Sequence, residues 1–523
     1  MGTVDRERGL VAEMPDGARL VADAWHPSGP GPWPVLLQRL PYGRSVASAP
    51  VLPSPAQLAR LGYAVVVQDV RGRGDSEGVF VPFADEAADG AATIEWAAAL
   101  PFSNGDVITY GYSYQGLAQL LAAARRPPHL RGVAAMMCGS GPYEGWTYAG
   151  GCLQWSFVAT WACQLMAQER GAVPRAPRFD ALPSIGAVGP DTPAWWRDWL
   201  AHPTFDDYWR SMTPDLAAIE VPLFTVLGYF DQFSAATAHL VTATEAEVVC
   251  GPWAHMPWGT RAGDIELGES AGPRTAIAAF LAFVARVAGH GTAPAVRARW
   301  VPIGDARWRA TGSWPPPAQV RRWDATSDTG ANSRHGDGRL VPAPSTGVRP
   351  SSPAAPAGPP QLSDVLVAEP LVPFPGDLVP LDDVSAAEDR RDVLCYTSDV
   401  LAAPLLVAGS PVVTVSAVAD SPTFDVVASL VAVDPRGVAR RLVTGALRSR
   451  ASAVEGARID LGPVAWRGAA GERVRLEVSA SRFPHFDRNP LSDEGLVPLV
   501  ERDGYRVATI EVTGVRLELP VVD

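Results

Sequence analysis

The sequence predicts a parallel α/β domain that is followed by an all-β domain. Three observations lead to this prediction. In the first half, apolar runs typical of buried strands alternate with helix-like segments, as in a parallel sheet covered by helices. A tryptophan-rich, helix-like stretch interrupts the alternation between about residues 141 and 221. After about residue 291 the helical periodicity disappears and short alternating strands take over.

The first half supplies the strands and helices of the α/β domain. A helix is predicted over residues 84–100, because acidic residues near its start favour the positive end of the helix dipole. A second helix over 276–287 closes this part of the chain. Five apolar runs are predicted to form strands, at residues 34–38, 63–69, 107–110, 223–227 and 247–250.

The tryptophan-rich stretch is predicted to be an insertion between two strands of the sheet. An insertion at this place would lie over the sheet as a helical cap. We therefore expect a catalytic domain of residues 1–143 and 221–290, with a cap of residues 144–220. The tryptophans of the cap are Trp146, Trp155, Trp161, Trp195, Trp196, Trp199 and Trp209.

Residues 291–523 are predicted to form a jelly-roll β-sandwich domain. The proline-rich stretch at 342–360 is incompatible with the interior of a strand or helix, so we expect a long surface loop there. The clearest strand patterns of this domain lie at residues 411–418, 425–433, 473–478 and 506–512.

Composition excludes several classes of protein. With 47% hydrophobic and 19% charged residues, the chain is globular rather than disordered. A net charge of −12 argues against nucleic acid or an anionic membrane as a partner. The N-terminus does not resemble a signal peptide, and no segment has the apolar length of a membrane span. The five cysteines are scattered and contain no CxxC pair, so we expect reduced thiols in a cytoplasmic protein without a metal site.

A serine lies where a strand is predicted to turn sharply into a helix. The segment Gly111-Tyr112-Ser113-Tyr114-Gln115-Gly116 follows the strand at 107–110 and precedes a helical run. Such a turn exposes the serine hydroxyl and presents backbone N–H groups to a developing oxyanion. The segment departs from the pattern G-x-S-x-G, because Gln115 occupies the final glycine position and Gly116 comes one residue later.

An acid and a histidine follow at the ends of the next two predicted strands. The strand at 223–227 leads into Asp231, and the strand at 247–250 leads into His255. Alone, Asp231 fits a helix N-cap and His255 fits a core histidine. The order serine, acid, histidine, each at a strand end, is that of a nucleophile, its orienting acid and its general base. We therefore predict a catalytic triad of Ser113, Asp231 and His255.

With these residues in place, the chain resembles a known family, the cocaine esterase-like (CocE/NonD) hydrolases. These are grouped with the X-prolyl dipeptidyl peptidases and the α-amino acid ester hydrolases. The resemblance covers nearly the whole chain and includes the serine turn. It also rests on Arg39-Leu40-Pro41-Tyr42, Gln68 to Gly78, His202 to Trp209, Gly228 to Phe233, Gly251 to His255, Asp392 to Ser398, and Phe483 to Pro490.

The resemblance implies an α/β-hydrolase core, a helical cap and a C-terminal jelly roll. It also implies an oxyanion hole formed by the Tyr42 hydroxyl and the Tyr114 backbone N–H. A fixed phenol that points at a developing negative charge lowers a barrier by a few kcal/mol. The resemblance further implies an aromatic acyl pocket of Trp146, Trp161 and Phe233. Core packing is the competing interpretation for each of these three side chains.

The expected activity is hydrolysis of a small ester by way of an acyl-enzyme, with an aromatic or bulky acyl group and no cofactor or metal. Three alternatives remain open. The chain could be an X-prolyl or aminoacyl peptidase or amidase, an acyltransferase of natural products, or a decayed hydrolase that serves as a binding protein. The sequence leaves the substrate and the oligomeric state undetermined.

Overall fold

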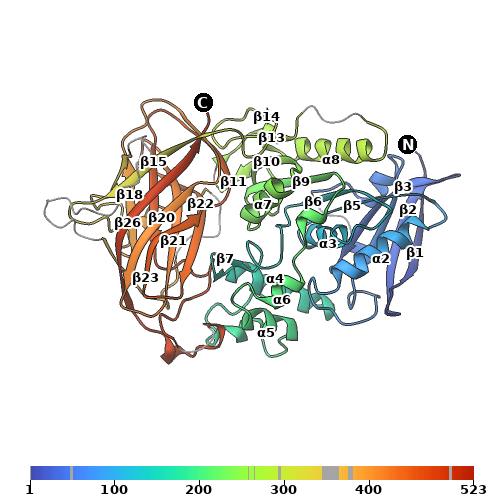
Figure 1. Ribbon diagram of the computed structural model, residues 1–523, viewed down its shortest axis with the longest axis horizontal. Coiled ribbons are helices and arrows are strands. Elements are labelled where there is room, and N and C mark those ends of the chain that lie inside the picture. Colours follow the sequence, from blue (N-terminus) through green and yellow to red (C-terminus); the bar gives the residue numbers. More distant parts are fainter. Residues whose placement is uncertain are drawn as a thin grey trace.

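A computed structural model of the chain contains three parts (Figure 1). The α/β core, blue to green, lies at one end, and the all-β domain, orange to red, lies at the other. The cap helices lie between them along one side of the molecule. These are α4 (Trp155–Glu169), α5 (Ala194–Ala201) and α6 (Asp207–Ser211). The structure describes residues 2–46, 51–256, 258–263, 265–291, 296–343, 364–374, 381–493 and 497–523.

The core is built on one sheet, with strands in the order β1-β2-β4-β3-β5-β6-β9-β10-β13-β14. The strands from β4 to β13 in this order run parallel, and antiparallel strands flank them at both edges. The strands are β1 (Val4–Glu13), β2 (Arg19–Pro27), β3 (Trp33–Leu40), β4 (Ala64–Asp69), β5 (Ser103–Tyr112), β6 (Leu130–Met136), β9 (Leu223–Phe230), β10 (Glu247–Ala254), β13 (Ala298–Trp300) and β14 (Arg309–Thr311).

Helices cover both faces of this sheet, which explains why its central strands are apolar on both sides. Successive side chains of a strand point to opposite faces. On β3, Val35 and Leu37 accordingly pack with α2 and α3, whereas Leu36 packs with α1 and α8. Helix α7 follows β9 and packs against it. The core helices are α1 (Pro55–Ala59), α2 (Glu86–Ala98), α3 (Tyr114–Ala123), α7 (Ser234–Thr244) and α8 (Arg274–Val287).

The predicted α/β fold is confirmed, with one change at its end. The sequence ends the catalytic domain at residue 290. However, β13 pairs with β10 and β14 pairs with β13, so the core sheet continues as far as Thr311. The chain thus adds two short strands to the first sheet before it enters the second. Three-residue strands such as these leave almost no periodic signal in a sequence.

The C-terminal domain is all-β, as predicted. Within the described residues it consists of a twelve-stranded sheet and a short helix, α9 (Ser385–Glu388). The predicted loop at 342–360 lies outside the described residues from 344 onward. The strands are β15 (Gln319–Thr326), β16 (Arg339–Pro342), β17 (Asp364–Ala368), β18 (Val393–Ser398), β19 (Leu405–Gly409), β20 (Val412–Ala419), β21 (Phe424–Val433), β22 (Ala439–Ser449), β23 (Ala453–Asp460), β24 (Val464–Gly468), β25 (Arg473–Ser479) and β26 (Ala508–Val521).

Three properties of the chain bear on its partners and its location. Among the described residues, no helix is long and apolar enough to cross a membrane. In the same part of the chain, no group of three or more His, Cys, Asp or Glu side chains could hold a metal ion. All five cysteines are buried thiols that form no disulfide bond.

A buried arginine joins the all-β domain to the cap. Arg448 on β22 donates to both carboxylate oxygens of Asp425 at 2.9 and 2.8 Å, and to Asp487 at 2.9 Å. Asp487 in turn accepts a hydrogen bond from the Leu153 backbone in the cap, at 2.9 Å. The Arg448 backbone N–H donates to the Gly150 carbonyl at 2.8 Å. The short hairpin of β7 (Tyr148–Ala149) and β8 (Cys152–Leu153) is thereby bound to the all-β domain.

We expect Arg448→Ala to lower the free energy of unfolding by about 3–5 kcal/mol, because it leaves Asp425 and Asp487 buried without their cation. Urea denaturation measures this change. Arg458→Ala is the control, since Arg458 is exposed and lies 3.6 Å from Glu518. It should change stability by no more than about 0.5 kcal/mol. Equal effects of the two substitutions would contradict a special role for Arg448.

Candidate active site

Ser113 occupies a strained turn between β5 and α3. Its φ is 61° and its ψ is −135°, a conformation that residues other than glycine rarely adopt. The Ser113 N–H donates to the Met136 and Met137 carbonyls at 3.0 and 3.2 Å, which fixes the turn against the end of β6. Surrounding structure must hold such a backbone in place, and strain of this kind concentrates at functional sites.

The residues around Ser113 explain why the glycine pattern is altered. A Cβ atom on Gly111 would lie 2.6 Å from the Gln115 Cβ, and one on Gly116 would lie 2.6 Å from the Cys138 Cβ. Glycine is therefore needed at both positions. Gln115 is buried, and its Oε1 accepts a hydrogen bond from Gln38 Nε2 on β3 at 2.8 Å. The side chain at this position thus joins the helix to the sheet, which a glycine could not do.

Tyr114 begins helix α3, and its backbone N–H has no hydrogen-bond acceptor within the described residues. An N–H at the first position of a helix is available to an anion. The Tyr114 side chain is fully buried, donates to Glu86 Oε1 at 2.8 Å and accepts from the Phe83 N–H at 3.2 Å. Glu86 also forms a buried ion pair with Arg39 of β3. These contacts hold the start of the helix in place.

Asp231 and His255 follow the ends of the neighbouring parallel strands β9 and β10. His255 Nδ1 lies 2.9 Å from Asp231 Oδ1. The Asp231 side chain is 0% exposed and that of His255 is 19% exposed. Burial raises the pKa of Asp231, while the charge and hydrogen bond of His255 act in the opposite direction. A histidine bound through Nδ1 keeps Nε2 available for proton transfer.

The Tyr42 hydroxyl lies beside the serine turn. Trp161 Nε1 on α4 donates to this hydroxyl at 3.0 Å. Burial raises the pKa of Tyr42, whereas Trp161 and the nearby Ser113 hydroxyl act in the opposite direction. The phenol is therefore neutral at physiological pH. Because it accepts a hydrogen bond from Trp161, its own proton can be donated elsewhere.

The three aromatic side chains expected around the acyl group also lie together. Trp146 and Phe233 are stacked, with ring centroids 4.1 Å apart and planes 3° apart. Trp161 meets Trp146 edge-on at 5.9 Å, and Phe233 meets His255 edge-on at 5.1 Å. All three are at most 5% exposed. They pack against one another and reach the site from the cap and from the loop that contains Asp231.

Arg73 is a contributor to this region that sequence reasoning did not single out. Its Nε donates to the Pro41 carbonyl at 2.8 Å, immediately before Tyr42. The same guanidinium donates to the Leu165 carbonyl at 3.3 Å and pairs with Glu169, both on helix α4. It thus binds the Tyr42 loop to the cap. The available signal was the arginine- and glycine-rich segment at 68–78, which the sequence analysis used only as a motif of the family resemblance.

The residues of that segment also form arginine–aspartate pairs with the loop that follows β3. Asp69 at the end of β4 accepts from the Arg44 backbone and guanidinium, both at 2.5 Å. Arg44 also pairs with Asp75 within the segment. A Cβ atom on Gly74, where φ is 57°, would lie 2.1 Å from Asp69 Oδ2. The close approach therefore requires a glycine at this position.

Comparison with known proteins identifies the family. The family model described as X-Pro dipeptidyl-peptidase (S15 family) matches residues 16–257. The model of the X-Pro dipeptidyl-peptidase C-terminal non-catalytic domain matches residues 288–502. The chain belongs to the cocaine esterase-like and X-Pro dipeptidyl-peptidase-type hydrolases. It is thus a serine hydrolase, and the sequence-based family assignment is confirmed.

Relatives within this family match the whole architecture. The chain is 29% identical to a cocaine esterase of Rhodococcus sp. (strain MB1 Bresler), over 92% of this chain and 91% of the relative. It is 25% identical to a putative serine esterase of Mycobacterium bovis, over 97% and 94%. An aminopeptidase from a marine sediment Thaumarchaeota archaeon has a similar fold, with a TM-score of 0.81, 22% identity, and coverage of 100% and 97%. An α-amino acid ester hydrolase has a TM-score of 0.79, also with 22% identity and coverage of 100% and 97%.

We expect Gly74→Ala to lower the free energy of unfolding by roughly 2–4 kcal/mol, because it adds a clash with Asp69 to backbone strain. Urea denaturation measures this loss. Gly62→Ala separates the two effects, since Gly62 has a φ of 100° and no atom within 4 Å of an added Cβ. It should lower the same quantity by only about 1 kcal/mol. If the Gly74→Ala protein were as stable as the Gly62→Ala protein, the clash with Asp69 would be relieved at no cost in the free energy of unfolding.

Proposed function

We propose that this protein hydrolyses small carboxylic esters with an aromatic or bulky acyl group, through an acyl-enzyme formed on Ser113. The observation that carries the proposal is the 2.9 Å hydrogen bond between His255 Nδ1 and the buried Asp231, at the same sheet edge as the strained Ser113 turn. This combination supplies a nucleophile, a general base and an acid that orients the base.

In the first step, His255 Nε2 takes the proton of the Ser113 hydroxyl as the oxygen attacks the ester carbonyl. The carbonyl oxygen becomes an oxyanion, which accepts hydrogen bonds from the Tyr42 hydroxyl and the Tyr114 N–H. Asp231 holds the imidazole in the tautomer that carries its proton on Nδ1 and stabilises the imidazolium that forms. Collapse of the tetrahedral intermediate breaks the ester C–O bond, and His255 passes its proton to the departing alkoxide.

In the second step, water attacks the acyl-enzyme. His255 takes a proton from this water, the same two donors hold the second oxyanion, and collapse releases the acid. His255 returns the proton to the Ser113 oxygen. Apart from the ester and water, these steps use only groups of the chain.

Two observations favour an ester over a peptide. The residues that follow Asp231 are Gln232, Phe233 and Ser234, none of which carries a charge that could hold a free α-amino group. Phe233 lies edge-on to His255 and stacks on the buried Trp146, so the surroundings of this histidine are aromatic, which favours an aromatic acyl group. The cocaine esterase relative, which shares the full architecture, gives further support. Peptidase activity is the second candidate, because the matching family model is that of X-Pro dipeptidyl-peptidases.

We also propose a cytoplasmic location and a small-molecule partner. The location rests on the five buried thiols, since proteins of reducing compartments keep their cysteines unpaired. The partner is the ester itself, because a net charge of −12 is unfavourable for binding nucleic acid.

Ser113→Ala should lower kcat/KM for p-nitrophenyl and aromatic esters by about 10⁴-fold or more, because the nucleophile is lost. A hydrolysis assay with purified protein measures it, with an aminoacyl-proline anilide on the same plate. Preference for the esters supports an esterase, and preference for the anilide supports the peptidase.

His239→Ala is the control for this experiment. His239 is an exposed histidine of α7 that lies 3.1 Å from Ser140 Oγ, so its loss should leave the rate within a few-fold of the wild type. Equal rates for wild type and Ser113→Ala on every substrate would contradict the proposal. Reaction of Ser113 with a fluorophosphonate would then decide whether the enzyme is narrowly specific or is a binding protein.

Tyr42→Phe should lower kcat by roughly 10²-fold to 10³-fold and change KM little, because the hydroxyl acts mainly on the charge of the transition state. Steady-state kinetics on the preferred ester measure this separation. Trp161→Phe keeps an aromatic ring but removes the 3.0 Å hydrogen bond to Tyr42, so we expect a smaller fall in kcat. A Tyr42→Phe enzyme with unchanged kcat would remove Tyr42 from the oxyanion hole.

A further inference from the structure

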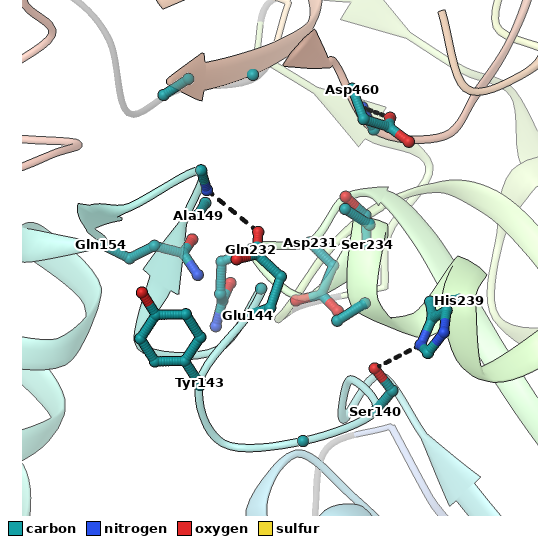
Figure 2. Close-up of a pocket in the computed structure, with 18 of the residues that line it drawn as sticks. Ser140, Tyr143, Glu144, Ala149, Gln154, Asp231, Gln232, Ser234, His239 and Asp460 are labelled. Atoms are coloured by element: carbon teal, nitrogen blue, oxygen red, sulfur yellow. Dashed lines mark hydrogen bonds between the residues drawn. The ribbon is translucent and has the colours of Figure 1, made fainter. Parts of the chain in front are cut away.

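Helix α4 of the cap carries Trp161, whose Nε1 donates to the Tyr42 hydroxyl at 3.0 Å. The first turn of this helix borders a cavity of about 1000 Å³ where the core, the cap and the all-β domain meet, since Ser156 and Phe157 line the cavity. Figure 2 shows Gln154, the residue before the helix, in the same wall. A helix that borders a cavity has fewer packing contacts on that side than a helix within a core. Polar contacts at its other end therefore contribute more to its position.

Arg73 makes polar contacts at that other end. Its Nη2 donates to the Leu165 carbonyl at 3.3 Å, one turn after Trp161 on the same helix. Its Nη1 pairs with Glu169, the last residue of α4. The Nη2 atom also lies 3.5 Å from Gln168 Oε1. The end of the helix that carries Trp161 is thus bound to one guanidinium group.

The same guanidinium binds the loop that carries Tyr42. Its Nε donates to the Pro41 carbonyl at 2.8 Å, and Tyr42 is the next residue. Burial raises the pKa of Tyr42, and the charge of Arg73 is among the groups that act in the opposite direction, so the guanidinium also lies near the phenol. A guanidinium is planar and donates along fixed directions. Arg73 therefore holds the Tyr42 loop and the end of α4 at a fixed separation.

The surroundings of Arg73 leave it little freedom to move. The residue is 4% exposed, and the centre of its guanidinium lies 5.1 Å from the centroid of the Phe80 ring. Burial lowers the pKa of Arg73, while the charge of Glu169 acts in the opposite direction. A buried cation is stable only when its donors have acceptors. The carbonyls of Pro41 and Leu165 therefore fix the guanidinium as firmly as it fixes them.

We propose that Arg73 is a positioning residue for Tyr42, the proposed oxyanion donor. It joins the loop that carries Tyr42 to the helix that carries Trp161, and so keeps the two partners of the 3.0 Å hydrogen bond in register. With Trp161 donating to its oxygen, the Tyr42 hydroxyl directs its own proton at the oxyanion. A shift of this donor by about 1 Å is enough to slow the reaction strongly. The inference rests on the proposed function, because it requires Tyr42 to act on the oxyanion.

A double-mutant cycle of Arg73→Lys and Tyr42→Phe tests this proposal, with kcat and KM measured on the preferred ester. Lysine keeps the positive charge, but its single flexible ammonium group cannot hold the loop and the helix in one geometry. We expect Arg73→Lys alone to lower kcat roughly tenfold and to change KM by less than about threefold. In the Tyr42→Phe background the same substitution should change kcat by less than about twofold, because the hydroxyl that Arg73 positions is absent.

Arg71→Lys is the matched control. Arg71 belongs to the same segment, and it donates to Asp89 at 2.8 and 2.7 Å and to Asp16 at 2.7 Å, both in the core. Its substitution should leave kcat within about twofold in both backgrounds. An equal fall in kcat for Arg73→Lys with and without the Tyr42 hydroxyl would overturn the proposal, because Arg73 would then act by another route. An unchanged kcat in Arg73→Lys would overturn it as well.

The cycle separates this inference from the oxyanion role on which it rests. If Tyr42→Phe alone leaves kcat unchanged, the oxyanion role and the inference both fail; if Tyr42→Phe lowers kcat but the two effects multiply, only the inference fails. Should circular dichroism show that Arg73→Lys does not fold, Glu169→Gln takes its place, because the Glu169 side chain is 53% exposed. It should lower kcat about threefold in the wild type and not in Tyr42→Phe. No fall, or the same fall in both backgrounds, would overturn the proposal.

Discussion

The hydrogen bond between His255 and the buried Asp231 carboxylate is the contact on which the rest of the site depends. A buried Asp231 carboxylate without a partner would destabilise the fold by several kcal/mol. The neighbouring strand must therefore place a hydrogen-bond donor beside it. Strands β9 and β10 are parallel neighbours, paired at Gly228 and Gly251 and again at Phe230 and Ala254. A bulge between Gly251 and Ala254 takes up the extra residue of β10. Asp231 and His255 therefore leave the same sheet edge side by side.

The cap is bound to the other two parts of the molecule by buried or half-buried arginine contacts. Arg448 holds the β7–β8 hairpin to the all-β domain, and Arg73 holds helix α4 to the loop before Tyr42. These contacts are more directional than apolar packing, because a guanidinium donates along fixed directions. A cap held at both ends keeps the aromatic side chains that it contributes, Trp146 and Trp161, in fixed positions relative to Ser113.

The sequence predicts those features of this arrangement that depend on residues close together in the chain. Ser113, Asp231 and His255 each follow an apolar run, so a linear pattern was sufficient to place them at the ends of strands. Strand β6 escaped prediction, because its small and charged residues, such as Arg131 and Gly132, weaken the apolar signal. The oxyanion role of Tyr42 could be suggested only by the family resemblance, since a tyrosine that follows a strand can have many roles.

The cavity could not have been predicted from the sequence, because its walls come from segments as distant as Glu144 and Asp460. No periodicity or spacing in a linear sequence relates such segments. They meet only because the cap and the all-β domain pack against the core. The contacts between Arg73 and the cap could not be predicted from the sequence either, since its partners there lie more than 90 residues away along the chain.

In the proposed mechanism, Trp161 would join substrate selection to catalysis. Its ring packs edge-on against Trp146 and stacks on Trp199, with centroids 5.9 Å apart, while its Nε1 donates to the Tyr42 hydroxyl. If Trp161 also contacts the acyl group, as the family resemblance implies, an acyl group that displaces it would disturb Tyr42, the proposed oxyanion donor. Acyl groups that fit poorly would then react slowly as well as bind weakly, because part of their binding energy would be spent on displacing Trp161 and disturbing the Tyr42 hydroxyl. Selectivity in this enzyme is therefore expected to appear in kcat as well as in KM.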